Sequence, residues 1–422
     1  MTTITDPPKH QFRLSMLLYD TRYRAATIQV VALFVFMLLA AWLINNTAHN
    51  LAELGKPIDF GFFGEVASYD INQRLLDYTS QDTHLRAALI GLLNTLVVAI
   101  LGCVTATILG VCVGVLRLSH NWLIARLMTV YVEMFRNVPV LLWIVFIMAI
   151  LIEMLPAPSA FRGSNASASM ILGDSVALTN RGIYVPEALF SHSLGNIHLF
   201  GSSSLRFDVS LDLVAFLIVL AAGLWASHRI KLRADRIQEE TGDRPTTWYL
   251  RAGVVLVPVV ALLAALGFHL GMPELKGFNF SGGTHLRNSL IALWLALSLY
   301  TAAFIAEIVR AGILAISKGQ TEAAAALGLR PGRVMRLVIL PQALRVIVPP
   351  LISQYLNLTK NSSLAIAVGY MDITGTLGGI TMNQTGRELE CVLLLMAIYL
   401  VISLTISGVM NWYNESVKLR ER

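Results

Sequence analysis

A series of apolar segments, each long enough to cross a lipid bilayer, is the feature that most constrains how this chain folds. A transmembrane helix needs about 20 apolar residues to cross a hydrocarbon core roughly 30 Å thick. Of the 422 residues, 55% are hydrophobic and only 14% are charged, which excludes an ordinary soluble domain. We therefore predict an all-α, polytopic membrane protein with about eight transmembrane helices. The expected spans are residues 25–46, 88–116, 136–155, 211–228, 252–272, 288–309, 346–368 and 389–412.

Basic residues predict the orientation of these spans, because Lys and Arg are enriched in cytoplasmic segments. Of the 32 Lys and Arg residues, 21 fall in segments 1–24, 117–126, 229–251, 310–345 and 413–422. We therefore expect both termini in the cytoplasm. The polar leader before residue 25 is similar to a signal peptide, but no clear small-residue cleavage site follows it, so we expect an uncleaved anchor helix.

Composition and missing motifs exclude several functions. The net charge of +6 comes from basic residues beside the spans, which is typical of a cytoplasmic membrane surface, so we expect no nucleic-acid partner. Cys103, Cys112 and Cys391 lie in apolar stretches without paired spacing, so we predict neither a disulfide nor a metal site. The sequence contains no GxxxxGK(S/T), HExxH or GxSxG motif. We expect no catalytic residues, no ATP site and no cofactor in this chain.

The segment EAAAALGLRPGRVMRLVILPQ, residues 322–342, stands between two predicted spans on the cytoplasmic side. Its alanines favour a helix, for which Thr321 is the expected N-cap. Gly328 is expected to end that helix, and Pro331 to begin a second short helix that Pro341 interrupts. The segment therefore predicts a helix-turn-helix at the membrane surface.

The spacing of this segment is similar to a known motif. Glu322-Ala323-Ala324, three residues, Gly328, nine residues and then Val338-Ile339-Leu340-Pro341 resembles the EAA loop of bacterial ABC importer permeases, with Val338 in place of isoleucine. In that family the loop forms a coupling helix that docks into the ATPase subunit. The residues that the resemblance assigns to ATPase coupling are Gly319, Glu322, Ala323, Ala324, Gly328, Arg333, Leu340 and Pro341.

Other stretches extend the resemblance to the polar amino-acid uptake branch of these permeases. They are GLLNTLVVAILG from Gly91, YVEMFRNVPVLLW from Tyr131, AAFIAEIVRAGILAISKGQ from Ala302 and LNLTKNSSLA from Leu356. The layout, longer than five spans, resembles the general L-amino-acid permeases. It implies a type I ABC importer core in residues 88–155 and 287–422, preceded by a leader, anchor helix and periplasmic loop in 1–87 and interrupted by a two-span insertion in 156–286.

The resemblance also implies partners and a location. The expected partners are cytoplasmic ATPase subunits that bind the ATP, a second permease subunit of similar layout, which favours a heterodimer, and a periplasmic amino-acid-binding protein. The expected location is the bacterial inner membrane, so the lipid bilayer is itself a partner. An ion-coupled secondary amino-acid transporter is the alternative. The EAA loop favours the ATP-driven importer, because a secondary carrier has no ATPase to dock.

Polar residues inside the predicted spans are candidates for the transport pathway. Counting about 1.5 Å per residue from Arg345 places Lys360 roughly 22 Å into the bilayer. An ionisable group at that depth costs free energy unless it faces protein or water. Two interpretations remain open, a pathway lining or a lysine that extends to the outer headgroups. The candidate pathway residues are Asn357, Lys360, Asn361, Ser362 and Ser363.

Two further pairs have two interpretations each. Glu307 and Arg310, near the cytoplasmic end of the sixth span, are either a gating or structural pair or a solvated helix end. Gly110 and Gly114 form a GxxxG pattern, which is either a tight helix contact or chance glycine in a membrane helix.

Overall fold

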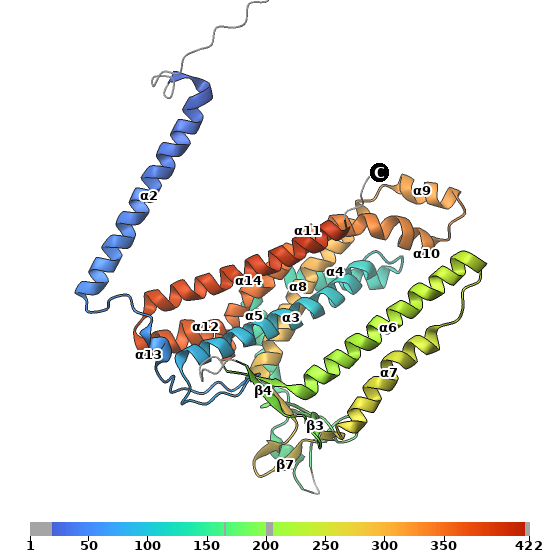
Figure 1. Ribbon diagram of the computed structural model, residues 1–422, viewed down its shortest axis with the longest axis horizontal. Helices are drawn as coiled ribbons and strands as arrows, with labels where there is room; N and C mark the ends of the chain where they lie inside the picture. The colour runs from blue at the N-terminus through green and yellow to red at the C-terminus, as the bar shows by residue number, and fades with distance from the viewer. Residues whose placement is uncertain (1–18, 164–165, 200–205, 418–422) are drawn as a thin grey trace, which may run out of the picture. The chain divides into compact units, whose positions relative to one another are not determined.

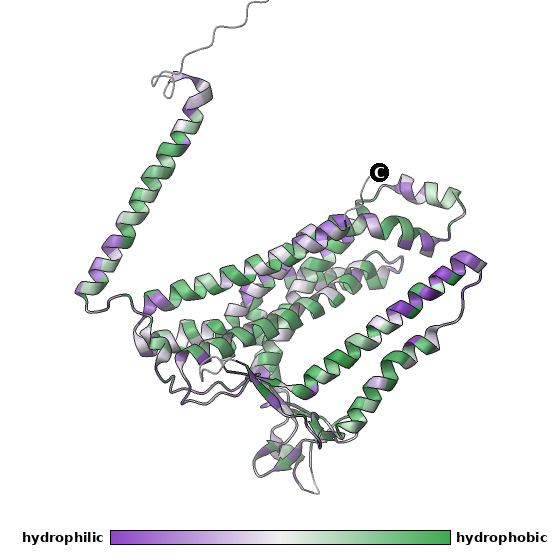
Figure 2. Ribbon diagram, viewed as in Figure 1, coloured by the Kyte–Doolittle hydropathy of each residue, from purple (hydrophilic) through white to green (hydrophobic). Residues whose placement is uncertain are grey.

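The structure, a computed structural model, describes residues 19–163, 166–199 and 206–417. Within these residues, eight helices are long and apolar enough to cross a membrane, which confirms the predicted all-α polytopic fold. Figure 2 shows the apolar residues along these helices. The helices that form the spans are α2 (Thr21–Glu53), α3 (His84–Leu116), α5 (Val140–Glu153), α6 (Leu211–Thr241), α7 (Trp248–Ala265), α8 (Asn288–Leu314), α11 (Leu340–Asn361) and α14 (Glu388–Val417).

The chain divides into two compact units, Met1–Gly61 and Phe62–Arg422. The first contains α2, and none of the described side chains of this helix is buried. By length and hydropathy this helix is a candidate membrane span. Its interpretation as an uncleaved anchor stays a prediction.

The second unit is built around close packing of α3 against α8. A Cβ atom added at Gly110 would lie 2.6 Å from Ile305 Cβ, and one at Gly114 would lie 2.7 Å from the Ala306 carbonyl oxygen. Only glycine permits that approach, so the GxxxG pattern is a tight helix contact. The Thr105 hydroxyl adds a polar link, because it lies 2.5 Å from the Ser298 hydroxyl of α8.

The third predicted span, residues 136–155, begins too early. A separate helix α4 (Trp122–Asn137) precedes α5, and the chain is extended at Val138 between them. Pro139 explains the break, because proline lacks a backbone N–H and disfavours helical backbone in the residue before it. Arg136 therefore belongs to α4, where its guanidinium lies 5.5 Å from the centre of the Phe304 ring.

The insertion contains the two predicted spans, α6 and α7, which lie side by side (Figure 1). The second of them is shorter than predicted, because the helix ends at Ala265 and Gly267 takes the left-handed backbone conformation, φ +64°. The sequence did not predict the short strands of this region. They are β1 (Ala177–Thr179), β2 (Gly182–Val185), β3 (Glu187–Phe190), β4 (Asn196–Leu199), β5 (Phe207–Ser210), β6 (Phe268–Gly271), β7 (Glu274–Lys276), β8 (Asn279–Ser281) and β9 (Thr284–Arg287).

These strands form small antiparallel ladders. One sheet has the order β1-β2-β9, and the other pairs are β3-β6, β4-β5 and β7-β8. In the three-stranded sheet Gly182 pairs with Arg287, and α8 begins at the next residue. The insertion is thereby joined to the start of the central helix.

Short helical elements complete the chain. Before α3 and within the insertion lie η1 (Gly61–Gly64) and η2 (Pro158–Phe161). The others follow α8, and they are α9 (Lys318–Ala326), α10 (Pro331–Val334), η4 (Met335–Ile339), η5 (Ser362–Val368), α12 (Ile373–Gly375), η6 (Thr376–Thr381) and α13 (Met382–Thr385).

Replacing Gly110 by leucine tests the α3–α8 contact. Gly110→Leu is expected to lower the free energy of unfolding by about 1–3 kcal/mol, because the side chain would overlap Ile305. The measurement is the thermal unfolding temperature in detergent. Gly408→Leu in α14 is the matched control, because a Cβ atom there meets no atom within 4 Å. Equal unfolding temperatures for the two variants would contradict the tight contact.

Candidate functional site

The segment that resembles the EAA loop, residues 317–341 and hereafter the EAA segment, forms two short helices, α9 and α10, beyond the end of α8 (Figure 1). Gly328 has φ +77° and follows the end of α9, where its N–H donates to the Ala325 carbonyl. Pro331 is the first residue of α10. The predictions that Gly328 ends one helix and Pro331 begins the next are confirmed.

Two details of the prediction are wrong. Thr321 is not the N-cap, because α9 begins at Lys318 and Ser317 takes the capping position with extended backbone. Pro341 does not interrupt the second helix, which continues through the π-helical turn η4 into α11. The wider turn accommodates the ring, and the Gln342 amide donates to the Val338 carbonyl at 3.0 Å.

Most of the predicted coupling residues lie on the surface of the chain. Ala324 of α9 and Val334 of α10 are buried, whereas Leu340 is 42% exposed and Pro341 is partly buried. The other exposed members are Gly319, Glu322, Ala323, Gly328 and Arg333. Most of the motif is therefore left uncovered by the rest of the described chain.

Three ionisable side chains meet beside the EAA segment. The Glu307 carboxylate accepts from the Arg310 guanidinium at 2.5 Å and also from Arg117 at the end of α3. Side-chain exposure is 10% for Arg117, 27% for Glu307 and 33% for Arg310. The predicted pair is therefore part of a three-residue ion cluster that ties α3 to α8. The sequence did not single out Arg117, which lies far from Glu307 along the chain.

The candidate pathway residues divide between two sides of the α11–η5 junction. Ser362 is fully buried and donates to the Thr359 carbonyl at 2.7 Å, and the Ser363 hydroxyl donates to the Lys360 carbonyl at 2.8 Å. Asn361 is half-buried, whereas Asn357 and Lys360 are exposed. Among the described residues, no carboxylate pairs with Lys360. The chain alone therefore leaves this lysine uncovered.

A buried polar network lies at the other end of α3 and α8, and sequence reasoning missed it. The Asn94 amide donates to the Gln73 carbonyl at 2.7 Å and to the Met371 carbonyl at 2.8 Å, and Thr95 accepts from the Ile373 N–H at 3.0 Å. Asp372 is fully buried and accepts from the Gly375 N–H at 2.8 Å. The adjacent polar residues Asn94 and Thr95 in an apolar span were the available signal.

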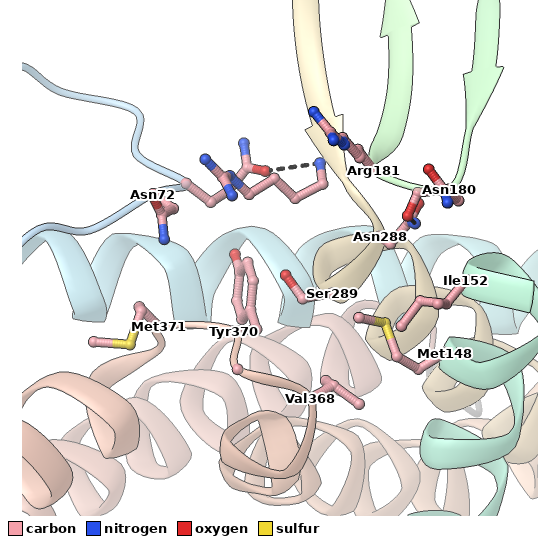
Figure 3. A pocket seen from close by; sticks show the side chains of 13 residues that line it. Asn72, Met148, Ile152, Asn180, Arg181, Asn288, Ser289, Val368, Tyr370 and Met371 are labelled. Carbon is pink, nitrogen blue, oxygen red and sulfur yellow. Dashed lines mark hydrogen bonds between the residues drawn. The ribbon is translucent and has the colours of Figure 1, made fainter. Parts of the chain in front are cut away.

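A cavity of about 240 Å³ opens next to this network (Figure 3). Figure 3 shows Asn180 and Arg181 of the insertion on one side, Met148 and Ile152 below them, and Tyr370 opposite. The lining residues are Asn72, Gln73, Met148, Ile152, Asn180, Arg181, Arg287, Asn288, Ser289, Val368, Gly369, Tyr370 and Met371. The cavity brings together five segments of the chain at the start of α8. No group of His, Cys, Asp or Glu within the described ranges could hold a metal ion.

Eight spans and an exposed two-helix EAA segment are the features of a membrane permease of the importer type. The comparisons agree, because residues 243–419 match the family of binding-protein-dependent transport system inner membrane components. The chain is 59% identical, over the whole length of both proteins, to a glutamate/glutamine/aspartate/asparagine transport system permease of Rhodobacter capsulatus.

Two further relatives also match over nearly the whole length of both proteins. A general L-amino acid transport system permease of Rhizobium johnstonii is 42% identical over 97% of this chain and 96% of its own. A putative amino-acid ABC transporter permease of Escherichia coli is 42% identical over 94% of this chain and 95% of its own. The chain therefore belongs to the binding-protein-dependent transport permease family. This membership favours the ABC permease over the ion-coupled alternative.

Asp372, which lies between the last two spans, predicts a pH dependence of stability. Burial raises the pKa of Asp372 to about 6, well above its ordinary value. A raised pKa stabilises the fold while the group is protonated, so stability falls as pH rises from about 4 to 6 and then levels off. Asp372→Asn keeps the shape without the charge, so we expect it to unfold at a higher temperature than the wild type above pH 6.

The cause of the raised pKa of Asp372 is the cost of burying its charge, and Asp372→Asn removes that cost. The difference in unfolding temperature between Asp372→Asn and the wild type is expected to shrink as pH falls from 6 to 4. Thermal unfolding in detergent at several pH values across that range measures it. Asp243→Asn, at an exposed site, is the control and is expected to behave like the wild type. An advantage that did not change with pH would contradict ionisation of Asp372 as the cause.

Proposed function

We propose that this chain is the transmembrane permease subunit of an ATP-driven importer of amino acids, with glutamate, glutamine, aspartate and asparagine among its substrates. The full-length likeness to a permease for these four amino acids carries the proposal. The EAA segment supports it independently, because its small and exposed surface suits a docking element. The chain forms the translocation path and has no ATPase site or cofactor of its own.

The proposed partners follow from the surfaces that the chain leaves open. The EAA segment docks on a cytoplasmic ATPase, so ATP is bound outside this chain. A second permease subunit of similar layout covers the exposed face of α11, and a periplasmic binding protein delivers the amino acid to the opposite end of α8. In this proposal the second subunit is a different chain, so the permease pair is a heterodimer.

The orientation in the bacterial inner membrane follows from charge. The segments richest in Lys and Arg alternate with the eight spans, which supports a cytoplasmic position for the EAA segment and both termini. The cavity at the start of α8 then faces the periplasm. A 27-residue helix rises about 40 Å, so α8 connects the two faces.

Asn357 and Lys360 form part of the transport pathway in this proposal. An uncovered ammonium within the membrane costs at least about 2.5–3.5 kcal/mol unless it faces protein or water. A second permease against this face of α11 supplies such an environment. Asn361, Ser362 and Ser363 continue the polar lining where α11 changes to the 3₁₀ helix η5.

Transport then follows from alternating access. ATP binding closes the two ATPases and moves the EAA segments of the two permeases toward each other. The ion cluster of Arg117, Glu307 and Arg310 transmits that movement to α3 and α8, because it joins the ends of both helices. The permease pair opens to the periplasm and receives the amino acid from the binding protein.

Gly328→Asp tests the coupling function. The variant adds a carboxylate and bulk at the turn of the EAA segment, where the left-handed backbone favours glycine. An unpaired buried charge at a protein contact costs several kcal/mol, so association with the ATPase is expected to fall about a hundredfold. Co-purification of the ATPase and ATP-driven uptake are both expected to be lost, at normal membrane levels of the permease.

Gly242→Asp is the matched control for this variant. Gly242 has nearly the same backbone, φ +78°, and equally open surroundings, but it ends α6 instead of α9. It is expected to retain the ATPase. Normal binding of the ATPase to Gly328→Asp, with hydrolysis that still responds to the binding protein, would disprove the coupling role.

Lys360→Ala tests the pathway. A lost interaction of about 1.4 kcal/mol in the rate-limiting step lowers the rate tenfold, so we expect about tenfold slower uptake at saturating binding protein, or a changed preference among the amino acids. Lys276→Ala, in the insertion, is the control for loss of one positive charge and is expected to transport normally. Unchanged uptake of every amino acid by Lys360→Ala would instead support a lysine that reaches the headgroups.

A further inference from the structure

The cavity at the start of α8 brings two arginines together without an acidic partner. Arg181 lies in the turn between β1 and β2, next to Gly182, and Gly182 pairs with Arg287 of β9. In the described parts of the chain, neither guanidinium forms an ion pair with a carboxylate. Both arginines line the cavity, so an anionic ligand bound there would supply the negative charge that the described chain does not provide.

The guanidinium groups on this side of the cavity also have N–H donors without hydrogen-bond acceptors. The Arg287 Nε atom is buried and has no hydrogen-bond partner. Arg181 makes one long hydrogen bond, from its guanidinium to the Phe278 carbonyl at 3.4 Å. Arg287 is the N-cap residue of α8, and its side chain makes no capping bond. The positive end of a long helix dipole therefore adds to the two guanidiniums.

Unused acceptors lie on the same cavity. The Asn180 and Asn288 side-chain oxygens are both buried without a hydrogen-bond partner. Asn288 is 4% exposed, and its amide group donates to the Asn180 carbonyl at 2.7 Å, which fixes the direction of its oxygen. A buried oxygen without a partner costs about 1–3 kcal/mol. A cationic donor such as an ammonium group would satisfy both oxygens.

One small cavity thus has arginine donors without acceptors and asparagine oxygens without donors. Such a lining suits a ligand with one negative and one positive group. We propose that this cavity binds the head group of a free amino acid, with its carboxylate at Arg181 and Arg287 and its ammonium at the side-chain oxygens of Asn180 and Asn288. The ligand's own side chain lies against Met148, Ile152 and Val368. The volume of about 240 Å³ is below the roughly 300–1,000 Å³ of drug-sized sites, which suits a small metabolite.

This inference rests on the proposed function and gives the insertion a role in it. Asn180 and Arg181 belong to the insertion, whereas Arg287 and Asn288 stand where the second part of the permease core begins. The site is therefore complete only when the insertion packs on the core. The amino acid would occupy this site transiently during transport, at the end of α8 opposite the EAA segment.

Equilibrium binding of radiolabelled L-glutamine to the purified permease–ATPase complex, without the binding protein, tests the site. We expect saturable binding to the wild type. Arg181→Gln and Arg287→Gln are each expected to bind at least about tenfold more weakly, and the double variant to show no saturable binding. Arg162→Gln is the matched control, because this exposed arginine of the insertion lies outside the cavity lining. It is expected to bind like the wild type.

Competitors separate the possible ligands. L-Glutamate and unlabelled L-glutamine are expected to displace the label. Glutarate, which has no ammonium group, and inorganic phosphate are expected to fail. Displacement by phosphate as effective as that by L-glutamate would show an anion site only and would overturn the proposal. Unchanged binding by the double variant, or no binding to the wild type, would also overturn it.

ATP-driven uptake of the same amino acids into proteoliposomes, measured with the binding protein present, separates the two proposals. Uptake by the wild type together with unchanged binding by the double variant would reject the site and leave the importer function intact. No ATP-driven uptake of any amino acid by the wild type would reject the importer function itself. Arg181→Lys and Arg287→Lys keep the charge, so partial recovery of binding in them would show that the loss is not caused by misfolding.

Discussion

The rest of the structure depends on how closely α3 approaches α8. Gly110 and Gly114 bring the backbone of α3 against Ile305 and Ala306, at distances that leave no room for a Cβ atom. In a membrane, helices gain little from hydrophobic association, so such contact and interhelical hydrogen bonds hold them together. The packed helices α3 and α8 then hold a different polar site at each of their two ends.

The two ends of the α3–α8 pair carry different polar groups. At one end Glu307 holds Arg310 and the α3 residue Arg117, and the chain continues into the exposed EAA segment. At the other end Asn94 and Thr95 tie α3 to Met371 and Ile373 in the segment after η5, and the cavity opens beside them. The packed pair of helices α3 and α8 therefore connects the EAA segment at one end with the cavity at the other.

Particular residues show how far the sequence could be interpreted. The eight spans, the turn at Gly328 and the start of α10 at Pro331 were all predicted, because each depends on neighbouring residues. Pro341 and Thr321 were assigned wrongly by the same local rules. A π-helical turn precedes Pro341, and Ser317, not Thr321, is the N-cap of α9. Local propensity thus identified the elements but not every boundary.

The sequence by itself determined that the chain crosses the membrane eight times and presents an EAA segment, because apolar length and motif spacing are properties of contiguous residues. The tertiary structure decided that Arg117 joins Glu307, and that the GxxxG pattern is a true contact. It alone assembled the cavity, whose residues come from 72–73, 148–152, 180–181, 287–289 and 368–371. Those segments are far apart along the chain, and only the packing of the insertion against α8 brings their unpaired polar atoms together.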